Sequence, residues 1–479
     1  MSTANEACCG STDANGAYDL IVVGAGSAGF SAAITAAEQG KQIALIGDGT
    51  IGGTCVNVGC VPSKTMIRAA ETLHQVQAAS RFDGIEAHAS VTDWKAVIGQ
   101  KQTLVDDLRQ AKYADLLPAY NNVAYLEGRA TVVEGGVLVD GNKIKADRTI
   151  IATGSSPAVP DIEGIDDVPY LTSTTALELE ALPDSLTVIG GGYIGCELAQ
   201  MFSRAGVQVT IVFRSRLLPE AEPEISDALT EYFTKENITV IDGVTYNRVS
   251  KNGERIALEI SHDGIDDTIV SDQLLITTGR HANTADMGLE DIGVELAPNG
   301  GIKTDDRMRT TAPGIYAAGD VTGQDQFVYM AAYGAKLAAR NALNGDAEQY
   351  DNRAMPAVVF TDPQVASVGL TEARAREQGI NVKTSMIELD HVPRALAARD
   401  TRGLIKLVAD RTTDQLIGAH ILAPEGADSI QTAALAIQQG MTVQALGDMI
   451  FPYLTTVEGL KLAAQTFDKD VAMLSCCAG

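Results

Sequence analysis

The sequence predicts an α/β protein of about three domains, and three observations support this fold class. The chain has 479 residues, whereas a domain averages roughly 150 residues. Its composition, with 45% hydrophobic and 5% aromatic residues and 46 glycines, is typical of a folded, glycine-rich protein rather than of a disordered or fibrous one. Two similar segments each place a glycine-rich turn between an apolar strand and a helix. Such units build parallel sheets that are covered by helices.

The first of these segments is YDLIVVGAGSAGFSAAITAAEQGKQIALIG, which begins at Tyr18. Its apolar pattern predicts a strand over 18–23, a helix after the turn with Gly40 at its C-cap, and a second strand over 42–46. The run LIVVGAGSAGFSAAITAA is apolar, but the small and polar residues in its middle fit a strand, a turn and a helix better than a membrane span. We therefore expect no membrane insertion.

The second segment, SLTVIGGGYIGCELAQMFSRAGVQVTIVFR, follows the same plan from Ser185 to Arg214. In such a unit the glycines of a GxGxxG pattern allow a tight turn, the approach of a pyrophosphate and close packing of helix on strand, while the helix N-terminus offers amides and a positive dipole. Both segments contain this pattern in the strand–turn–helix context that makes it significant. The glycines are Gly24, Gly26 and Gly29 in the first segment and Gly190, Gly192 and Gly195 in the second. The sequence therefore predicts two bound dinucleotides.

The two segments differ at the end of their second strand, where a carboxylate normally hydrogen-bonds a ribose hydroxyl. The first segment has Gly47 there, followed by Asp48. The second has no acid and instead has Arg214 and Arg216. Because a guanidinium group binds a phosphate through a planar fork of donors, this end predicts NADPH rather than NADH. The alternative is two solvated arginines that follow a strand.

Charge limits the possible partners of the chain. It has 36 Lys and Arg residues against 62 Asp and Glu residues, a net charge of −26, which argues against nucleic acid and anionic membranes as partners. No Lys or Arg precedes Lys41, so the N-terminus resembles neither a secretory signal nor a transit peptide. A cytoplasmic protein is expected.

Most of the seven cysteines occur as close pairs. In a reducing cytoplasm such pairs are more often redox-active or metal-binding than structural. Cys196 stands alone in an apolar helical run and is interpreted as a small buried core residue. The pairs are Cys8 with Cys9, Cys55 with Cys60, and Cys476 with Cys477.

The segment IGGTCVNVGCVPSK, from Ile51 to Lys64, is the most informative. Its two cysteines, Cys55 and Cys60, are separated by four residues and can close a small disulfide ring at the start of a helix. A helix N-terminus lowers the pKa of a thiol and favours the thiolate.

With these features the chain resembles the flavin-dependent pyridine nucleotide disulfide oxidoreductases from about Tyr18 to Gly479. The resemblance implies FAD in the first unit, NADPH in the second, and a homodimer formed through a C-terminal interface domain. Further matching segments are IIATGSSP (150–157), LLITTGRHAN (274–283), GIYAAGD (314–320), MPAVVFTDPQVASVG (355–369) and the ending FPYLTTVEGLKLAAQTFDKDVAMLSCCAG. The implied organisation is a disordered tail over 1–17, an FAD-binding domain over 18–156 and 282–352, an NAD(P)H-binding domain over 157–281, and an α+β interface domain over 353–479.

The resemblance also implies roles for individual residues. Cys60 would be the thiolate beside the flavin ring, and Cys55 would exchange with substrate. Lys64 would lie near the reactive flavin nitrogen and pair with Glu197. Tyr193 would be a lid over the nicotinamide pocket, unless it is an ordinary packed tyrosine. Contacts to one cofactor or the other are implied for Gly24, Gly26, Gly29, Asp48, Thr54, Lys64, Gly154, Gly190, Gly192, Gly195, Arg214, Arg216, Gly279 and Asp320, the last at the ribityl chain of the flavin.

The segment YLTTVE separates the possible substrates. Members of the family that reduce disulfides carry a His here, followed five residues later by Glu, because a thiol leaving group needs a proton donor poised near neutrality. This chain has Tyr453 in the His position and Glu458 after it, and none of its six His residues lies in the segment. A soft metal ion held between thiolates needs only ligands and two electrons, which favours the members that reduce Hg(II).

The terminal pair Cys476 and Cys477 fits the same interpretation. Two adjacent thiols on a tail could take Hg(II) from cellular thiols and transfer it to Cys55 and Cys60, at an effective concentration on the order of mM. The four cysteines are thus the predicted Hg(II) ligands, and an accidental pair is the alternative. We interpret the N-terminal pair in EACCGST as part of a disordered tail, with an auxiliary metal-capturing pair as the alternative.

Three functions stay open at this stage. The first is NADPH-dependent reduction of Hg(II), the second is a disulfide reductase similar to glutathione reductase or dihydrolipoamide dehydrogenase, and the third is a flavoprotein that only sequesters a soft metal. Tyr453 favours the first over the second. Catalytic turnover distinguishes the third function from the first two, because a sequestering protein would oxidise no more than a stoichiometric amount of NADPH.

Overall fold

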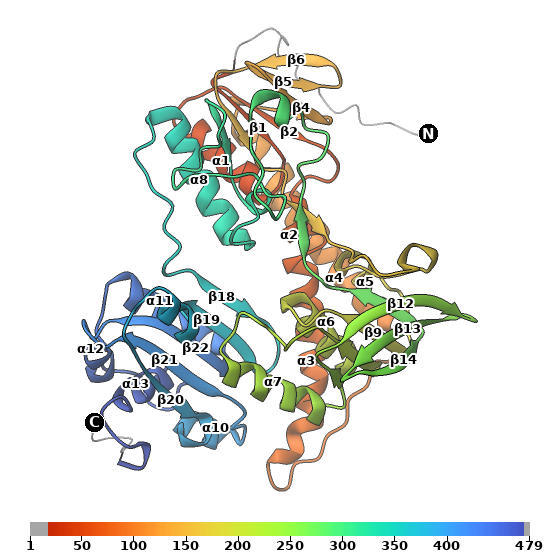
Figure 1. Ribbon diagram of the computed structural model, residues 1–479, viewed down its shortest axis with the longest axis vertical. Helices are drawn as coiled ribbons and strands as arrows, with labels where there is room; N and C mark the ends of the chain where they lie inside the picture. Colours follow the sequence, from red (N-terminus) through yellow and green to blue (C-terminus); the bar gives the residue numbers. More distant parts are fainter. Residues whose placement is uncertain (1–17, 474–479) are drawn as a thin grey trace. The chain divides into compact units, whose positions relative to one another are not determined.

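The computed structural model describes residues 18–473, and the chain divides into two compact units (Figure 1). Unit 1 contains the described residues up to Asn57 together with Leu104–Ser156 and Arg280–Tyr350. Unit 2 contains Val58–Thr103, Pro157–Gly279 and the described residues from Asp351 onward.

Unit 1 is built on a five-stranded parallel sheet with the order β17-β7-β1-β2-β3. Alternate residues of the strands face opposite layers. Leu20, Val22 and Leu45 pack against the helices α1 and α8, while Ile21 and Ile46 pack against a small antiparallel sheet, β4-β5-β6. The strands are therefore buried on both faces, which explains their continuous apolar sequence. The bounds are β1 Leu20–Val23, α1 Ser27–Ala37, β2 Ile43–Gly47, β3 Val123–Glu127, β4 Ala130–Val133, β5 Gly136–Val139, β6 Asn142–Lys145, β7 Thr149–Ile151, β17 Ile315–Ala317 and α8 Val328–Asn344.

The first predicted strand–turn–helix–strand segment lies at the centre of this sheet. Its strands pair in parallel, with Leu20 opposite Ile43. The first strand begins two residues later than expected, because Tyr18 forms only an isolated bridge with Ala146. The helix ends at Ala37, and Gly40 lies beyond its C-cap in the following turn, at a φ of +75°.

Unit 2 contains a second parallel sheet with the order β11-β10-β9-β15. The helices α6 and α3 share one hydrophobic core with it, in which Phe202 and Val188 are fully buried. A three-stranded antiparallel sheet, β12-β13-β14, belongs to the same part of the chain. The bounds are α3 Cys60–Gln77, β9 Ser185–Ile189, α6 Tyr193–Arg204, β10 Gln208–Val212, α7 Pro223–Lys235, β11 Thr239–Ile241, β12 Thr245–Asn252, β13 Arg255–His262, β14 Ile265–Ser271 and β15 Gln273–Ile276.

The C-terminal part of unit 2 is a five-stranded antiparallel sheet, β18-β19-β22-β21-β20, with helices packed on it (Figure 1). The bounds are β18 Pro356–Val359, β19 Gln364–Gly369, α9 Glu372–Glu377, β20 Val382–Glu388, α10 Pro393–Ala398, β21 Leu404–Asp410, β22 Leu416–Ala423, α11 Gly426–Gln438, α12 Val443–Asp448 and α13 Glu458–Gln465. The remaining regular elements are α2 Gly53–Asn57, α4 Trp94–Arg109, β8 Ser155–Pro157, α5 Ser173–Ala176 and β16 Arg280–Ala282. Two parallel-sheet domains and an α+β domain confirm the fold class predicted from the sequence.

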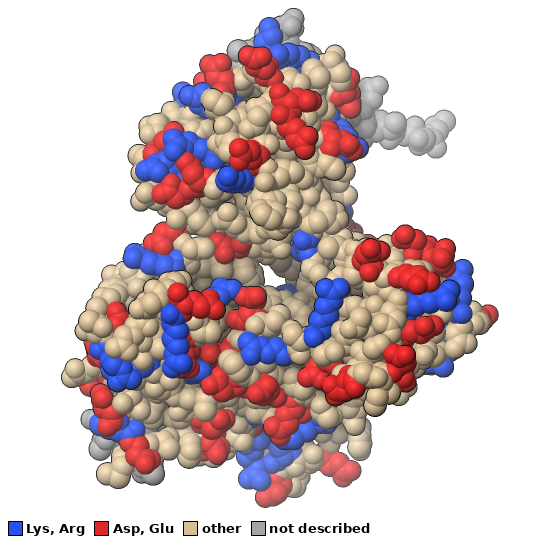
Figure 2. Space-filling model, in the orientation of Figure 1, with Lys and Arg blue, Asp and Glu red and all other residues tan. Residues whose placement is uncertain are grey.

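The surface carries charges of both signs. Figure 2 shows acidic and basic side chains interspersed on the face that it draws. Among residues 18–473, no helix has the length and hydropathy needed to cross a membrane.

A buried ion cluster within unit 2 joins the α7 region to the C-terminal sheet. Lys406 on β21 is buried, and its Nζ lies 3.0 Å from Glu222 Oε2, 2.7 Å from Glu224 Oε1 and 3.0 Å from Glu372 Oε2. Burial favours the neutral amine, but the bonds to the three carboxylates outweigh it and raise the pKa of Lys406 above its usual value. One ammonium group therefore holds three carboxylates at this junction.

Replacing Lys406 by Met should destabilise the protein by about 3–5 kcal/mol at neutral pH, because the carboxylates would lose their counter-charge inside the protein. The measurement is the midpoint of thermal unfolding. The loss should shrink at acid pH, since protonated carboxyl groups need no counter-charge.

Lys383→Met is the matched control, because Lys383 lies on the neighbouring strand β20 and pairs with one partly exposed carboxylate, that of Asp414, and with the Phe467 ring. Such a pair contributes about 0–1 kcal/mol. Equal losses in the two variants would show that the Lys406 cluster has no special role.

Candidate active site

The first glycine-rich turn connects β1 to α1 in unit 1. Gly24 has a φ of +115°, and a Cβ there would lie 2.2 Å from the carbonyl oxygen of Ala152. A Cβ on Gly29 would lie 1.7 Å from the carbonyl oxygen of Gly24. Gly26 is the N-cap of α1 and provides no capping side chain, so no such side chain covers the first amides of the helix. This turn has the close packing and the uncapped helix N-terminus that a pyrophosphate needs.

The second glycine-rich turn, between β9 and α6 in unit 2, repeats this geometry. Gly190 also has a φ of +115°, with a Cβ position 2.6 Å from the carbonyl oxygen of Thr277. A Cβ on Gly195 would lie 2.0 Å from the carbonyl oxygen of Gly190. Gly192 is the N-cap of α6, again without a capping side chain, and no described atom lies within 4 Å of its Cβ position. A dinucleotide therefore fits here for the same reasons.

The absence of a carboxylate at position 47 has a steric cause. A Cβ on Gly47 would lie 2.6 Å from Tyr125 Oη and 2.8 Å from the Cβ of Ala25. The Tyr125 ring comes from β3, which pairs in parallel with β2, and burial raises the pKa of its hydroxyl. Tyr125 was not predicted from the sequence, because only the strand pairing brings it beside Gly47. Asp48 is the exposed next residue.

Asp320 belongs to a small polar cluster in unit 1. Its Oδ2 accepts a hydrogen bond from Ser155 Oγ at 2.7 Å. Arg280 donates to Ser155 twice, from Nε to Oγ at 2.8 Å and from Nη2 to the carbonyl oxygen at 2.6 Å. Gly154, at a φ of +72°, precedes Ser155. The family resemblance implied cofactor contacts for Asp320 and Gly154 but not for Ser155 or Arg280, although both lie in matching segments.

The two central cysteines lie in consecutive helices. Cys55 and Thr54 are in α2 of unit 1, where the Asn57 side chain donates to the carbonyl oxygens of Ile51 and Gly53 at 2.9 and 2.8 Å. Cys60 is the first residue of α3 in unit 2 and is half-buried. The N-cap of α3 is a glycine, which leaves the helix N-terminus without a capping side chain. The helix dipole therefore favours a thiolate at Cys60.

Lys64 follows Cys60 by one turn of α3 and forms an ion pair with Glu197 of α6. Lys64 Nζ lies 2.6 Å from Glu197 Oε2, and the side chains are 33% and 5% exposed. The other oxygen of Glu197 accepts the backbone N–H of Phe360 at 2.9 Å. The Lys64 ammonium also lies 5.0 Å from the centre of the Phe360 ring, a cation–π distance. Phe360 lies in a quoted segment, but nothing in the sequence indicated this contact.

Two residues at the start of α6 have different environments. Tyr193 is the first residue of the helix and is half-buried, and burial raises the pKa of its hydroxyl. Cys196 is fully buried, with its Sγ 3.5 Å from the carbonyl oxygen of Gly191. Burial raises the pKa of this thiol well above its usual range. Its burial confirms the interpretation of Cys196 as a small buried core residue.

The structure distinguishes the two arginines that follow β10. Arg216 uses Nη2 to hold the carbonyl oxygens of Pro219 and Ala221, at 3.0 and 2.8 Å. Arg214 is exposed, and its guanidinium carbon lies 5.6 Å from the centre of the Tyr246 ring. Burial raises the pKa of Tyr246 to about 12, so the ring stays neutral. Arg214 is the better candidate for binding a phosphate, because Arg216 stabilises the local turn.

The segment that distinguishes the substrates is an ordered turn before α13. Tyr453 is 51% exposed, whereas Glu458 is buried and accepts the backbone N–H of Leu454 at 3.2 Å. Burial raises the pKa of Glu458. Within residues 18–473, no group of three or more His, Cys, Asp or Glu residues could hold a metal ion. Cys8, Cys9, Cys476 and Cys477 lie outside the described residues.

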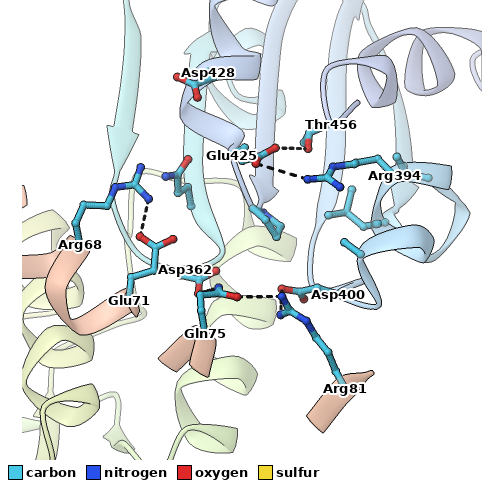
Figure 3. Close-up of a pocket in the computed structure, with 16 residues that line it drawn as sticks. Arg68, Glu71, Gln75, Arg81, Asp362, Arg394, Asp400, Glu425, Asp428 and Thr456 are labelled. Carbon is cyan, nitrogen blue, oxygen red and sulfur yellow. Dashed lines mark hydrogen bonds and ion pairs between the residues drawn. The ribbon is translucent and has the colours of Figure 1, made fainter. Parts of the chain in front are cut away.

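A polar pocket of about 390 Å³ lies farther along α3, within unit 2 (Figure 3). Most of its charged side chains pair with other residues, whereas Asp428 stands apart in Figure 3. Arg68 Nη1 lies 2.6 Å from Glu71 Oε2, and Arg394 Nη2 lies 3.7 Å from Glu425 Oε1. Figure 3 shows Gln75 between Asp362 and the Arg81–Asp400 pair. This internal pairing makes the pocket a structural junction between α3 and the C-terminal sheet.

Comparison with known proteins identifies the family. Residues 18–339 match the pyridine nucleotide-disulphide oxidoreductases, and residues 355–464 match the dimerisation domain of that family. The chain belongs to the pyridine nucleotide-disulphide oxidoreductase family. This confirms the resemblance inferred from the sequence, and the second match supports a homodimer.

Similar proteins cover nearly the whole chain. A mercuric reductase from Staphylococcus aureus is 47% identical over 97% of this chain and 85% of its own length, and one from Streptomyces lividans is 48% identical over 96% and 98%. Among solved structures, the Cu(II) complex of the HOCl-induced flavoprotein disulfide reductase RclA from Escherichia coli has a TM-score of 0.84 at 30% identity, covering 95% of this chain and 100% of that chain. LpdA from Mycobacterium tuberculosis has a TM-score of 0.83 at 28% identity, covering 94% of this chain and 100% of that chain. The cofactors of this chain are FAD and NADPH, which the two glycine-rich turns fit.

Arg214→Glu should weaken the recognition of NADPH by about 1.5–3 kcal/mol, because a charged hydrogen bond to the 2′-phosphate would be replaced by repulsion. This corresponds to roughly tenfold to a hundredfold in preference over NADH. The measurement is the ratio of NADPH to NADH oxidation rates.

Arg248→Glu is the control, because it makes the same charge change at another exposed arginine of the same domain. It should leave the ratio unchanged. An unchanged ratio in Arg214→Glu would mean that Arg214 does not bind the phosphate.

Proposed function

We propose that this protein is a mercuric reductase that uses NADPH, FAD and a redox pair formed by Cys55 and Cys60. The observation that carries the proposal is its 45–49% identity, over nearly the whole chain, to seven proteins named mercuric reductase. The substrate is Hg(II) bound to two thiolates. The balanced reaction is Hg(SR)₂ + NADPH + H⁺ → Hg(0) + NADP⁺ + 2 RSH, in which the two electrons of the hydride reduce the metal and both thiols leave protonated.

The chain's own residues bind the ion and hold the charges around it. Cys55 and Cys60 take Hg(II) from its carrier thiols by ligand exchange, since soft thiolates are the ligands that soft metals prefer. The uncapped N-terminus of α3 and the positive charge of Lys64 stabilise the Cys60 thiolate. Glu197 fixes the position of that charge through its ion pair. When bound, FAD supplies the two-electron transfer from NADPH to this centre.

Each cofactor is bound at one of the two glycine-rich turns, FAD at the first and NADPH at the second. FAD is held by the turn of Gly24, Gly26 and Gly29, by Thr54, Gly154 and Asp320, and by Asp48 in place of an acid at position 47. NADPH is held by the turn of Gly190, Gly192 and Gly195, by Arg214 with Arg216 supporting it, and by Gly279, with Tyr193 as the lid. For the functional domains we propose the boundaries expected from the sequence, in which residues 58–103 serve the FAD-binding domain although they pack within unit 2. The protein acts in the cytoplasm, where NADPH and small thiols are both present.

Tyr453 supports a metal substrate rather than a disulfide. Reduction of a disulfide requires a proton for the departing thiol, which a nearby His supplies. A tyrosine hydroxyl is a much weaker acid than a protonated imidazole, so Tyr453 is a poor replacement for His as a proton donor near neutral pH. Its hydroxyl instead assists in binding or exchanging the ion.

A disulfide reductase is the second candidate function, because the similar solved structures include a flavoprotein disulfide reductase at 30% identity. The test compares NADPH oxidation by the purified protein, in excess thiol, after addition of Hg(II) or of oxidised glutathione or lipoamide. The expected result is sustained NADPH oxidation with Hg(II) and little with either disulfide. The Tyr453→Phe variant should reduce Hg(II) more slowly than the wild type. Equal turnover with a disulfide would contradict the proposal. Oxidation of a single equivalent of NADPH would indicate sequestration instead.

We further propose that Cys476 and Cys477 deliver Hg(II) to Cys55 and Cys60 of the partner subunit. This rests on the two adjacent thiols at the chain end and on the family resemblance, in which the C-terminal region of one subunit serves the redox cysteines of the other. A second sulfur beside the first makes ligand exchange intramolecular.

A mixed dimer tests delivery between subunits. One parent has Cys476 and Cys477 changed to Ala, and the other has Cys55 and Cys60 changed to Ala. Under excess glutathione each parent should be nearly inactive. In the mixed dimer, isolated with two affinity tags, one site combines intact core cysteines with the intact tail of the other subunit. Delivery between subunits predicts up to half of the wild-type turnover, whereas an inactive mixed dimer would show delivery within one subunit.

A further inference from the structure

Three side chains on one face of α6 hold a single short segment of the C-terminal domain. Glu197, Gln200 and Arg204 are spaced at i, i+3 and i+7, which places them on one side of the helix. All three side chains are buried within unit 2. The segment that they contact is Phe360–Asp362, which follows β18.

The contacts form a short ladder between side chains and backbone. Glu197 Oε1 accepts the N–H of Phe360 at 2.9 Å, and Gln200 Oε1 accepts the N–H of Asp362 at 2.8 Å. Gln200 Nε2 donates back to the carbonyl oxygen of Asp362 at 2.8 Å. The alternate residues 360 and 362 therefore face α6, as they would face a neighbouring strand.

Gln200 makes the contact to Asp362 that an apolar side chain cannot replace. Its amide both accepts from and donates to the backbone of the same residue. The Asp362 carboxylate pairs with Arg204 Nη1 at 3.1 Å and Arg402 Nη2 at 3.2 Å. The same two arginines also donate to the Asp362 carbonyl oxygen, at 3.1 and 3.3 Å. Figure 3 shows Asp362 beside Gln75 of α3. Gln200 therefore shares the carbonyl oxygen with two arginines, and its own contribution is to accept the Asp362 N–H and so tie this backbone to α6.

Glu197 links this segment to the reacting centre. Its second oxygen pairs with Lys64 at 2.6 Å, one helical turn after Cys60. The Phe360 ring contacts the Lys64 ammonium as well. A displacement of Phe360 would therefore act on Lys64 through both its ion-pair partner and its aromatic contact.

We propose that Gln200 is a positioning residue, which fixes the Lys64–Glu197 pair beside Cys60 by holding the backbone of Phe360–Asp362. Gln200 touches neither Lys64 nor the cysteines in the described contacts, so it acts through Glu197 and Phe360. Its effect on turnover rests on the function proposed above, whereas its effect on the backbone does not.

Hydrogen exchange tests the positioning directly, because Glu197 protects the Phe360 N–H and Gln200 protects the Asp362 N–H. In Gln200→Met, exchange should accelerate at both amides by roughly tenfold or more. Gln364→Met is the matched control, since Gln364 is also buried and accepts a backbone N–H, that of Ala427, at 2.9 Å. It should leave the Phe360 amide unchanged. Acceleration at Asp362 alone would reduce Gln200 to a local structural role and overturn the proposal.

Gln200→Glu provides a second variant if Gln200→Met does not fold. It keeps the acceptor for the Asp362 N–H but replaces the donor with an oxygen that faces the Asp362 carbonyl oxygen. Exchange at both the Asp362 and the Phe360 amides should therefore accelerate relative to wild type, and an unchanged Phe360 amide would overturn the proposal.

A double-variant cycle tests the link to Glu197. Gln200→Met should lower kcat by roughly tenfold, as expected for a misplaced active-site group, with KM for Hg(II) thiolate within about twofold. Combined with Glu197→Gln, it should slow the reaction no further than Glu197→Gln alone, because both changes act on one pair. Additive losses would overturn the proposal. If no variant or wild-type protein reduced Hg(II), the proposed function would fail while the exchange result would still decide the role of Gln200.

Discussion

The close approach of helix to strand at the two glycine-rich turns is the constraint on which the rest of the structure depends. At both turns a Cβ on the third glycine would lie 2.0 Å or less from a carbonyl oxygen of the first, which excludes any other residue without a shift of the helix. The same contact sets the start of α1 and of α6. It thereby sets which amides face a pyrophosphate and, in α6, where Glu197 lies relative to α3. In α6, the close packing of the third glycine is therefore required both for nucleotide binding and for placing Glu197 beside Lys64.

The sequence predicted these turns because their information is local. Glycine spacing, strand length and helix length all lie within one short segment, and the parallel pairing of β1 with β2 and of β9 with β10 followed from it. The contacts that were missed depend on distant segments. Tyr125 reaches Gly47 only through the pairing of β2 with β3. Phe360 reaches Glu197 only when the C-terminal domain packs on α6. No periodicity or spacing encodes such pairs.

The arginines after β10 show how the structure refines a prediction from residue type. Both have the same charge and both follow the same strand, so the sequence treats them alike. The bonds of Arg216 to two carbonyl oxygens stabilise the turn that presents Arg214. A guanidinium group satisfied by backbone carbonyls keeps a loop in place, whereas one stacked on a tyrosine ring keeps donors available for a phosphate. The two residues therefore divide support and recognition between them.

The bonds of the turn before α13 show how Tyr453 can stand where disulfide-reducing members of the family carry His, with the turn still formed. Glu458 is buried and accepts the N–H of Leu454, which has a φ of +60°. Thr455 Oγ1 donates to the carbonyl oxygen of Pro452 at 2.8 Å and accepts the N–H of Glu458. These bonds use no atom of the Tyr453 side chain, so they shape the turn whichever residue stands there. Glu458 therefore has a structural role in the turn through the Leu454 N–H, in addition to any role that its charge has in the chemistry.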